Sequence, residues 1–183
     1  VGGAEVAAVC RNSFVAGTPV HTPDGLVPIE SLVPGDRVLA RDAVTGEAKE
    51  VAKVMAAIAR EVRTHGAPFK PPVALLSGGE CTVTVRRTAG RGGRCGEFLL
   101  GLGIELEGIA DVHAIAADTD GIDGSESNAG ALLAPDCLAR ARAQGLDPRK
   151  HLATNDSYGI FAALGDLVVT GPTRTNVNDY RAI

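Results

Sequence analysis

The chain has 183 residues, 45% of them hydrophobic and 22% charged, and a formal net charge of −4 at pH 7. This balance excludes intrinsic disorder, and the 23 glycines follow no three-residue period, which excludes a collagen-like chain. The length predicts about one domain. The mild acidity and the absence of Trp argue against nucleic-acid binding, and the lack of any apolar run of roughly 18 residues argues against a membrane helix.

The first part of the chain has the pattern of short strands and tight turns. Between residues 14 and 41, short apolar runs are separated by Pro-Asp-Gly at 23–25 and Pro-Gly-Asp at 34–36. Proline presets φ, aspartate bonds its own backbone and glycine accepts positive φ, so both tripeptides favour turns. We expect the first turn to join two strands in a β-hairpin, and a third short strand at 38–40.

From Thr45 the apolar residues follow a helical period. Thr45 can cap a helix that we predict over residues 46–64, and its frequent alanines favour that conformation. Gly66 and the prolines that follow it end the helix. The larger apolar residues lie on one predicted face, which we expect to pack in the core: Val51, Val54, Met55, Ile58 and Val62.

Strands and helices alternate through the rest of the chain. The alternation predicts a layered α/β domain with a mainly parallel or mixed sheet flanked by helices. The predicted strands are 73–76, stopped by Ser-Gly-Gly, then 81–87, 112–117 and 167–170. The predicted helices are 97–106, 135–144 and 157–164, the last two closed by glycines.

Four loops after predicted strands combine glycines with polar side chains. They are Ser-Gly-Gly-Glu at 77–80, Arg-Gly-Gly-Arg at 91–94, and the segments 118–124 and 170–179. Ligands of open α/β sheets bind beyond the carboxyl ends of the strands, so we expect such loops to converge.

The Arg-Gly-Gly-Arg segment is a candidate anion site. Its glycines let backbone N–H groups approach an oxyanion, and a guanidinium can bind the anion bidentately beside the positive end of a following helix. The alternative is a solvated glycine-rich turn. The chain has no GxxxxGK[ST] motif, so this is not a P-loop.

Asp118, Asp120 and Asp123 form a candidate metal-ligand set. The chain has Ala131 where an EF-hand needs its Glu, which excludes that motif. One interpretation is a magnesium ion that is held by one or two of these carboxylates and by substrate phosphates. An aspartate-rich turn that caps its own backbone is the other interpretation.

The cysteines and histidines carry no recognisable metal or disulfide motif. The cysteines at 10, 81, 95 and 137 form no CxxC, so we expect reduced thiols in a cytoplasmic protein. The four histidines lack metal-ligand spacing. Ser77 lies in SGGE rather than GxSxG, which gives no nucleophile elbow.

The second part of the chain, which we delimit as a domain of residues 44–183, resembles the C-terminal MOFRL domain of type 2 glycerate kinases, formerly labelled hydroxypyruvate reductases. The resemblance covers residues 47–183 in family order. It is carried by ALLSGGECTVTV at 74–85, GRGGR with Glu97 at 90–97, TDGIDG at 119–124, ARAQGLDP at 141–148, NDSYGIFAALGDLVVTGPT at 155–173 and TNVND at 175–179.

This resemblance implies a glycerate 2-kinase, which transfers a phosphoryl group from Mg-ATP to the 2-hydroxyl of D-glycerate. The family site lies between two α/β domains, and the front domain with its catalytic lysine has no counterpart here. Arg94 would bind the glycerate carboxylate or the moving phosphoryl, because this chemistry needs positioning and charge neutralisation. Glu80 with Asp120 or Asp123 would orient magnesium or the substrate hydroxyl. The implied substrate-binding residues are Ser77, Gly78, Gly79, Asn176 and Asn178.

The sequence departs from the family pattern at this candidate site. The family usually reads RNQE where this chain has Arg94-Cys95-Gly96-Glu97. It usually has Gly in place of Asp118 and a small residue in place of Arg174. Asp118 adds charge and bulk where a tight backbone is expected. The alternative to a kinase is therefore a non-catalytic remnant or an interaction domain.

Residues 13–42, SFVAGTPVHTPDGLVPIESLVPGDRVLARD, resemble the opening of a Hint domain, the self-processing module of inteins and hedgehog proteins. The family nucleophile stands where this chain has Ser13, whose hydroxyl could attempt an acyl shift. The later family blocks are missing, and about 30 residues bury too little surface for a whole Hint core. We therefore expect residues 1–43 to be a truncated segment without activity.

The expected ligands and partners follow from these resemblances. They are D-glycerate, ATP and Mg²⁺, together with a lysine-bearing α/β front domain. An apolar face is expected where that domain would pack, so the isolated chain can form a homo-oligomer.

Overall fold

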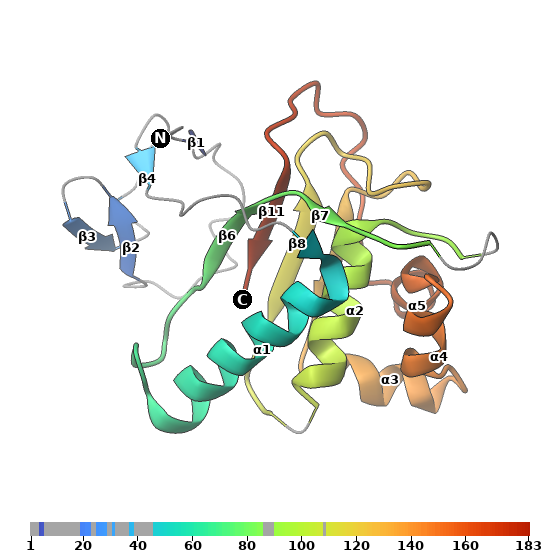
Figure 1. The fold of residues 1–183 in the computed structure, drawn as a ribbon, viewed down its shortest axis with the longest axis horizontal. Helices are drawn as coiled ribbons and strands as arrows, with labels where there is room; N and C mark the ends of the chain where they lie inside the picture. Colours follow the sequence, from blue (N-terminus) through green and yellow to red (C-terminus); the bar gives the residue numbers. More distant parts are fainter. Residues whose placement is uncertain are drawn as a thin grey trace.

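The computed structural model describes residues 4–5, 19–22, 25–28, 31, 37–38, 46–85, 90–107 and 109–183 (Figure 1). Its helices are α1 (Ala48–His65), α2 (Arg94–Glu105), α3 (Cys137–Ala143), α4 (Pro148–Ala153) and α5 (Ser157–Leu164). Its strands are β1 (Ala4–Glu5), β2 (Pro19–Thr22), β3 (Gly25–Pro28), β4 (Arg37–Val38), β5 (Gly46–Glu47), β6 (Leu76–Gly79), β7 (Cys81–Thr82), β8 (Ala114–Asp118), β9 (Gly130–Leu133), β10 (Leu167–Val168) and β11 (Asp179–Ala182).

The layered α/β class is confirmed, but the strand directions differ from a mainly parallel sheet. The main sheet has five strands in the order β10-β9-β8-β11-β6, and all four neighbouring pairs are antiparallel. Among the described strands, the parallel pair is β5 with β7. Alternation predicts parallel strands only if each helix returns the chain to the same end of the sheet. Here β8 is followed directly by β9, through a loop and without a crossover helix.

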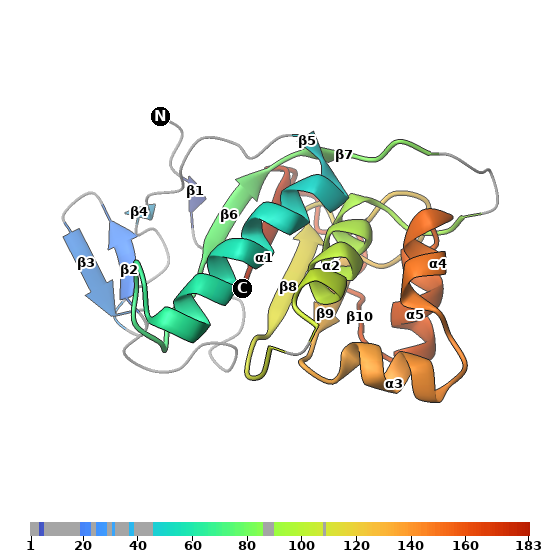
Figure 2. The same cartoon turned by 60° about the horizontal axis from the view of Figure 1, so that its bottom comes forward.

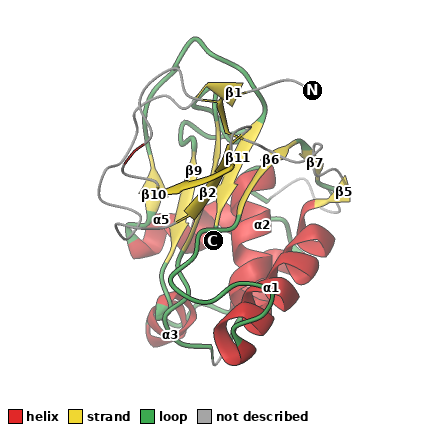
Figure 3. Cartoon of the chain, turned by 90° about the vertical axis from the view of Figure 1, so that its left-hand side faces the viewer, coloured by secondary structure: helices red, strands yellow, loops and turns green. Residues whose placement is uncertain are grey.

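Helix α2 is the centre of the core. Every residue from Cys95 to Ile104 is buried, and α2 contacts β8 and β9 on one side and α1, α3, α4 and α5 on the others (Figure 2). Helices α1 and α2 lie on the same side of the sheet (Figure 3). A helix that is apolar all round can be stable only when it is enclosed in this way.

Helix α1 forms as predicted, and the expected core face is confirmed in part, because Val62 is buried and Val51 and Met55 pack against the core. Val54 is 61% exposed and Ile58 37% exposed, whereas the alanine face is buried against α2. A Cβ on Gly101 of α2 would lie 3.2 Å from the Cβ of Ala52, so the two helices meet through small residues. Thr45 lies outside the described residues, and Glu47 takes the N-cap position. The buried residues of α1 are Ala48, Ala52, Ala56, Ala59 and Val62.

Strand β6 is displaced along the chain from its predicted position. We predict a strand at residues 73–76 that ends before Ser-Gly-Gly at 77–79. In the structure, the Ser-Gly-Gly residues are themselves part of β6 and pair with β11. Gly79 has φ of 107°, a conformation that favours glycine. Leu75 and Ile183 exchange two backbone hydrogen bonds and extend the pairing. The predicted strand at 81–87 is reduced to β7, and its residues 86–87 lie outside the described part.

The other elements divide into those predicted and those missed. The hairpin is confirmed, because β2 pairs antiparallel with β3 from Pro19–Pro28 to Thr22–Gly25. Helix α5 spans its predicted residues and ends on Gly165 in the left-handed conformation. Strands β9 and β11 and helix α4 were not predicted. No helix in the described part of the chain is both long enough and apolar enough to span a membrane.

Candidate active site

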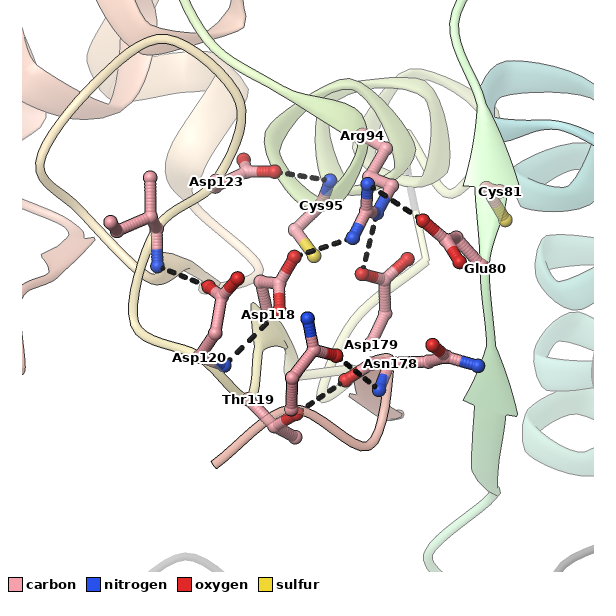
Figure 4. Close-up of polar contacts among 12 residues, drawn as sticks. Glu80, Cys81, Arg94, Cys95, Asp118, Thr119, Asp120, Asp123, Asn178 and Asp179 are labelled. Carbon is pink, nitrogen blue, oxygen red and sulfur yellow. Dashed lines mark hydrogen bonds and ion pairs between the residues drawn. The ribbon is translucent and has the colours of Figure 1, made fainter. Parts of the chain in front are cut away.

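A cluster of charged side chains forms where β8 ends, β11 begins and α2 starts. Asp118 and Asp179 are directly opposite each other in the β8–β11 pair. Arg94, the first residue of α2, lies between them (Figure 4). Its Nε is 2.7 Å from Asp179 Oδ1, its Nη2 is 2.5 Å from Asp118 Oδ2, and its Nη1 is 3.2 Å from Glu80 Oε1. One guanidinium is therefore held by three carboxylates that come from three segments of the chain.

The members of this cluster differ in their access to solvent. The side chains of Asp118 and Asp179 are buried, whereas that of Arg94 is 26% exposed and that of Glu80 is 54% exposed. The cluster thus has a buried, acidic base and an open edge formed by Arg94 and Glu80. The exposed part of Arg94 at this edge is where the guanidinium is open to an anion from solvent.

The surroundings raise the pKa values of both Arg94 and Asp118, which favours the charged form of the arginine and the neutral form of the aspartate. Burial opposes the charged form of Arg94, but Asp179, Asp118 and Glu80 outweigh it and raise the pKa of the guanidinium above its ordinary value. Burial also raises the pKa of Asp118, although the N–H of Asp120 and the charge of Arg94 act against that rise. Arg94 therefore stays positively charged throughout the physiological range.

Asp123 binds the N-terminus of α2. Its Oδ1 accepts from Cys95 N at 2.9 Å, and its Oδ2 accepts from Gly96 N at 2.8 Å. The side chain is fully buried, and burial raises its pKa to about 6 even though the two N–H groups favour the anion. The helix end that we considered as an anion site therefore already holds a carboxylate from the chain itself.

The glycines of the Arg-Gly-Gly-Arg segment allow close packing of the backbone. A Cβ on Gly93 would lie 2.3 Å from Asp123 Oδ1, and one on Gly92 would lie 2.5 Å from Ser157 Oγ. Arg91 pairs with Glu126 instead of joining the Arg94 cluster. The 118–124 loop and α5 can therefore pack closely against the start of α2. Of the two arginines in this segment, Arg94 is the one in the charged cluster.

The loop from β10 to β11 packs against the turn after β8. Thr119 Oγ1 donates to Asn178 O at 2.7 Å and accepts from Val177 N at 2.9 Å. Asn178 and Arg174 have φ of 67° and 61°, so Arg174 occupies a left-handed position that favours glycine. Asn176 Oδ1 accepts from Asn178 N at 3.1 Å, which makes its side chain part of an internal turn. The two asparagines are therefore at an exposed loop beside the 118–124 turn.

The predicted metal ligands do not share one environment. Asp120 Oδ1 accepts from Ile122 N at 2.8 Å in a tight turn, and its side chain is partly exposed, while Asp123 faces α2. Within the residues that the structure describes, no three His, Cys, Asp or Glu side chains gather closely enough to hold a metal by themselves. Mg²⁺ is commonly held by one or two carboxylates and by substrate phosphates. Asp120 fits that pattern, whereas both oxygens of Asp123 are already bonded in the core.

Two functional candidates, Asp179 and Arg181, were missed by the sequence analysis. Their spacing of two residues was the available signal, since residues i and i+2 of a strand lie on the same face. Arg181 is 1% exposed and contacts Ser77 Oγ, Gly78 O and Cys81 Sγ at 3.3, 2.8 and 3.2 Å. Arg181 thus connects the predicted residues Ser77 and Gly78 to Asp179 of the cluster. Ser13 lies outside the described residues.

The fold and the cluster define a class of protein: a mixed α/β domain with a charged site at the junction of β8, β11 and α2. Comparison with known families identifies that class, since the model of the MOFRL family matches residues 73–179. The chain belongs to the MOFRL family. The model of the Hint domain matches residues 12–78. This match supports the second resemblance, extends past its end at residue 42 through α1, and overlaps the first match at residues 73–78.

Curated relatives agree with this assignment. The chain is 58% identical over 143 residues to an Agrobacterium vitis protein that bears the name of a hydroxypyruvate reductase, covering 78% of this chain and 33% of that one. It is 43% identical over 133 residues to D-glycerate 2-kinase of Thermotoga maritima, covering 73% and 32%. The chain thus spans about a third of the length of these relatives.

Solved structures give the same result. The crystal structure of glycerate kinase from Thermotoga maritima superposes with a TM-score of 0.73 at 41% identity, over 76% of this chain and 34% of that one. A Pyrococcus horikoshii protein superposes with a TM-score of 0.71 at 37% identity, over 76% and 32%. The domain described here is therefore shared with glycerate kinases, whose remaining two thirds have no match in this chain.

Proposed function

We propose that this chain is the C-terminal part of a glycerate 2-kinase that transfers a phosphoryl group from ATP to D-glycerate. The observation that carries the proposal is Arg94, a cation fixed at its buried side by Asp118 and Asp179 and open to solvent at the other. A transferring phosphoryl group and a carboxylate substrate both need a fixed cation of this kind. The similarity to glycerate kinases over the same residues supports the assignment.

In this proposal the open edge of the cluster binds the substrate. Arg94 binds the glycerate carboxylate or the moving phosphoryl, and Glu80 beside it orients the substrate hydroxyl. Ser77, Gly78 and Gly79 border the cluster through Arg181 and Asp179. The partly exposed Asp120 is the carboxylate of its loop that we retain as a magnesium ligand. The exposed Asn176 and Asn178 complete the polar wall.

Magnesium and ATP belong to the proposal as the phosphoryl donor complex. Mg²⁺ bound to the phosphates would neutralise charge during the transfer, with Asp120 as one ligand from this chain. The lysine-bearing front domain would supply the other wall of the site. We therefore expect this chain to be inactive without that domain, and its cytoplasmic location stays a prediction.

A non-catalytic remnant is the second candidate, and one observation favours it. The Asp118 carboxylate contacts Arg94 Nη2 at 2.5 Å and so satisfies part of the guanidinium that an anionic substrate would otherwise use. A domain with its cation satisfied internally could fold and bind a partner without chemistry. Self-processing at Ser13 is a third and weaker proposal, and an unchanged mass after hydroxylamine treatment would remove it.

Addition of a front domain tests the kinase proposal. The full chain would be mixed with the corresponding N-terminal region of the Thermotoga enzyme, and ADP release would be measured with and without D-glycerate. As a second format, residues 73–183 would replace the matching part of that enzyme. The kinase proposal predicts D-glycerate-dependent ADP release in at least one format. Its absence from both would favour the remnant.

Substitution of Arg94 tests the site itself. Arg94→Ala should lower kcat/KM at least roughly a hundredfold, because a cation that stabilises the transition state is removed. Arg140→Ala is the matched control, since Arg140 pairs with Asp166 away from the cluster. A nearly unchanged rate in the Arg94 variant would remove this residue from the mechanism.

A further inference from the structure

Arg181 is a buried cation with an unusually complete set of acceptors. It is 1% exposed, and all three of its guanidinium nitrogens are in contact with acceptors. Its Nη1 lies 3.4 Å from Asp179 Oδ2, and the guanidinium lies over the Phe98 ring at 5.5 Å. A buried charge needs both a counter-charge and hydrogen bonds, so this environment determines the orientation of the side chain.

Asp179 connects Arg181 to Arg94, because its carboxylate contacts both guanidinium groups. One oxygen of Asp179 faces Arg181, and the other accepts from Arg94 Nε at 2.7 Å. Rotation of the Asp179 carboxylate would weaken one of the two contacts. Since its side chain is fully enclosed, water is not available to replace the lost partner.

Arg181 also holds the opposite border of the cluster. Its Nη2 donates to Gly78 O at 2.8 Å, and its Nε donates to Ser77 Oγ at 3.3 Å. These residues are in β6, while Arg94 is the first residue of α2. A single guanidinium therefore contacts one border of the proposed substrate site directly and the other through Asp179.

We propose that Arg181 is a positioning residue that holds Arg94, through Asp179, at a fixed distance from the Ser-Gly-Gly segment of β6. It lies beneath the site and does not touch substrate. Its effect on substrate binding rests on the proposed kinase function, whereas its effect on Arg94 does not. The two can therefore be tested separately.

The test uses the full chain and two variants, Arg181→Lys and Arg181→Met. The primary measurement is the ¹⁵N NMR signal of the Arg94 Nε–H and its rate of exchange with solvent. In the unmodified chain, the bond to Asp179 should protect this proton. Arg181→Lys keeps the charge but not the planar set of donors, so we expect about tenfold faster exchange, and faster still in Arg181→Met.

Arg140→Lys is the matched control. Arg140 makes a comparable contact with Asp166, at 2.6 Å, on a part of the surface away from Arg94. This variant should leave the Arg94 signal unchanged. If Arg181→Met fails to fold, as judged by its amide spectrum, the folded Arg181→Lys variant decides the result.

The second measurement is titration of each folded variant with D-glycerate and with inorganic phosphate. The proposal predicts about tenfold weaker binding after Arg181→Lys and no change after Arg140→Lys. An unchanged Arg94 exchange rate in folded Arg181→Lys would overturn the positioning role. If the unmodified chain binds neither anion while the Arg94 signal responds as expected, the kinase proposal is weakened and the positioning role stands.

Discussion

The inner face of the five-stranded sheet, under α2, carries Asp179 and Arg181, whereas the outer face carries Leu76, Leu132 and Tyr180. The inner charges are fully buried, while these three outer side chains are between 38% and 48% exposed. Charged side chains are seldom fully buried in soluble domains, and here two of them lie among inward-pointing apolar residues such as Leu133. The buried charges lie beneath the proposed site, and the exposed apolar side chains make the outer face suited to contact with another domain or copy.

The outer face is continuous because of the strand register. Leu132, Ile115, Ala182 and Leu76 are paired across four strands, and paired residues project on the same side. None of them is charged. The homo-oligomer and front-domain predictions both need such a surface.

The largest expected effect comes from removal of the charge that the inner face buries. Asp179→Asn keeps the side-chain shape but leaves Arg181 without its carboxylate, so the free energy of unfolding should fall by about 3–5 kcal/mol. Urea denaturation of the full chain measures it. The control is Asp166→Asn, which breaks the partly exposed pair with Arg140 and should cost about 1 kcal/mol or less. Equal losses would contradict the difference between buried and surface pairs.

Two adjacent leucines of β9 compare the faces directly. Leu133 points inward and is 4% exposed, while Leu132 points outward and is 48% exposed. Leu133→Ala should therefore lower the free energy of unfolding by about 2–5 kcal/mol, and Leu132→Ala by less than about 1 kcal/mol. Sedimentation of the Leu132 variant should also show weaker self-association. A larger loss of stability at Leu132 would mean that the outer face is covered within the chain.

The titration of Asp123, the buried carboxylate at the start of α2, should make the free energy of unfolding depend on pH. Burial raises the pKa of Asp123 to about 6 in the folded chain, above its unfolded value of about 3.9. The folded state therefore binds the proton more tightly, and stability contributed by Asp123 falls as pH rises from about 4 to about 6. The change is on the order of 3 kcal/mol, since each pKa unit corresponds to about 1.4 kcal/mol.

Asp123→Asn isolates this effect. The amide does not titrate, so the contribution of this residue to the pH slope between about 4 and 6 should disappear in parallel denaturation experiments. Asp120→Asn is the control, because Asp120 lies on the partly exposed part of the same loop. A slope that persists in the Asp123 variant would point to Asp118, whose pKa burial also raises.

Much of the fold could be predicted, and the misses have physical causes. Helix α5 was found because Gly165 terminates it in the left-handed conformation, which is a local signal. Strand β11 was missed because Asp179 and Arg181 are polar residues whose burial depends on partners 85 and 103 residues away. Local patterns do not contain such partners. The core face of α1 was predicted only in part for a related reason, since the packing of its alanines depends on Gly101 of α2.

The candidate site also has features that the sequence predicts and features that only the structure shows. Arg94 was predicted as an anion-binding residue, and the structure adds the three carboxylates around it. Asp123 was grouped with Asp120 because they are close in sequence, but its oxygens cap α2. Sequence spacing therefore pointed to charged loops that the structure brings together, and it could not assign the direction of each side chain.

The position of β11 between β8 and β6 has a consequence for the order of folding. Strand β6 joins the main sheet through β11, with pairs such as Ser77 with Arg181 that are separated by more than 100 residues. Closing so large a loop is entropically costly, so such contacts form late and slowly. During refolding, amides of β8 and β9 should gain protection from hydrogen exchange before those of β6. The proposed catalytic centre would then be the last part of the domain to assemble.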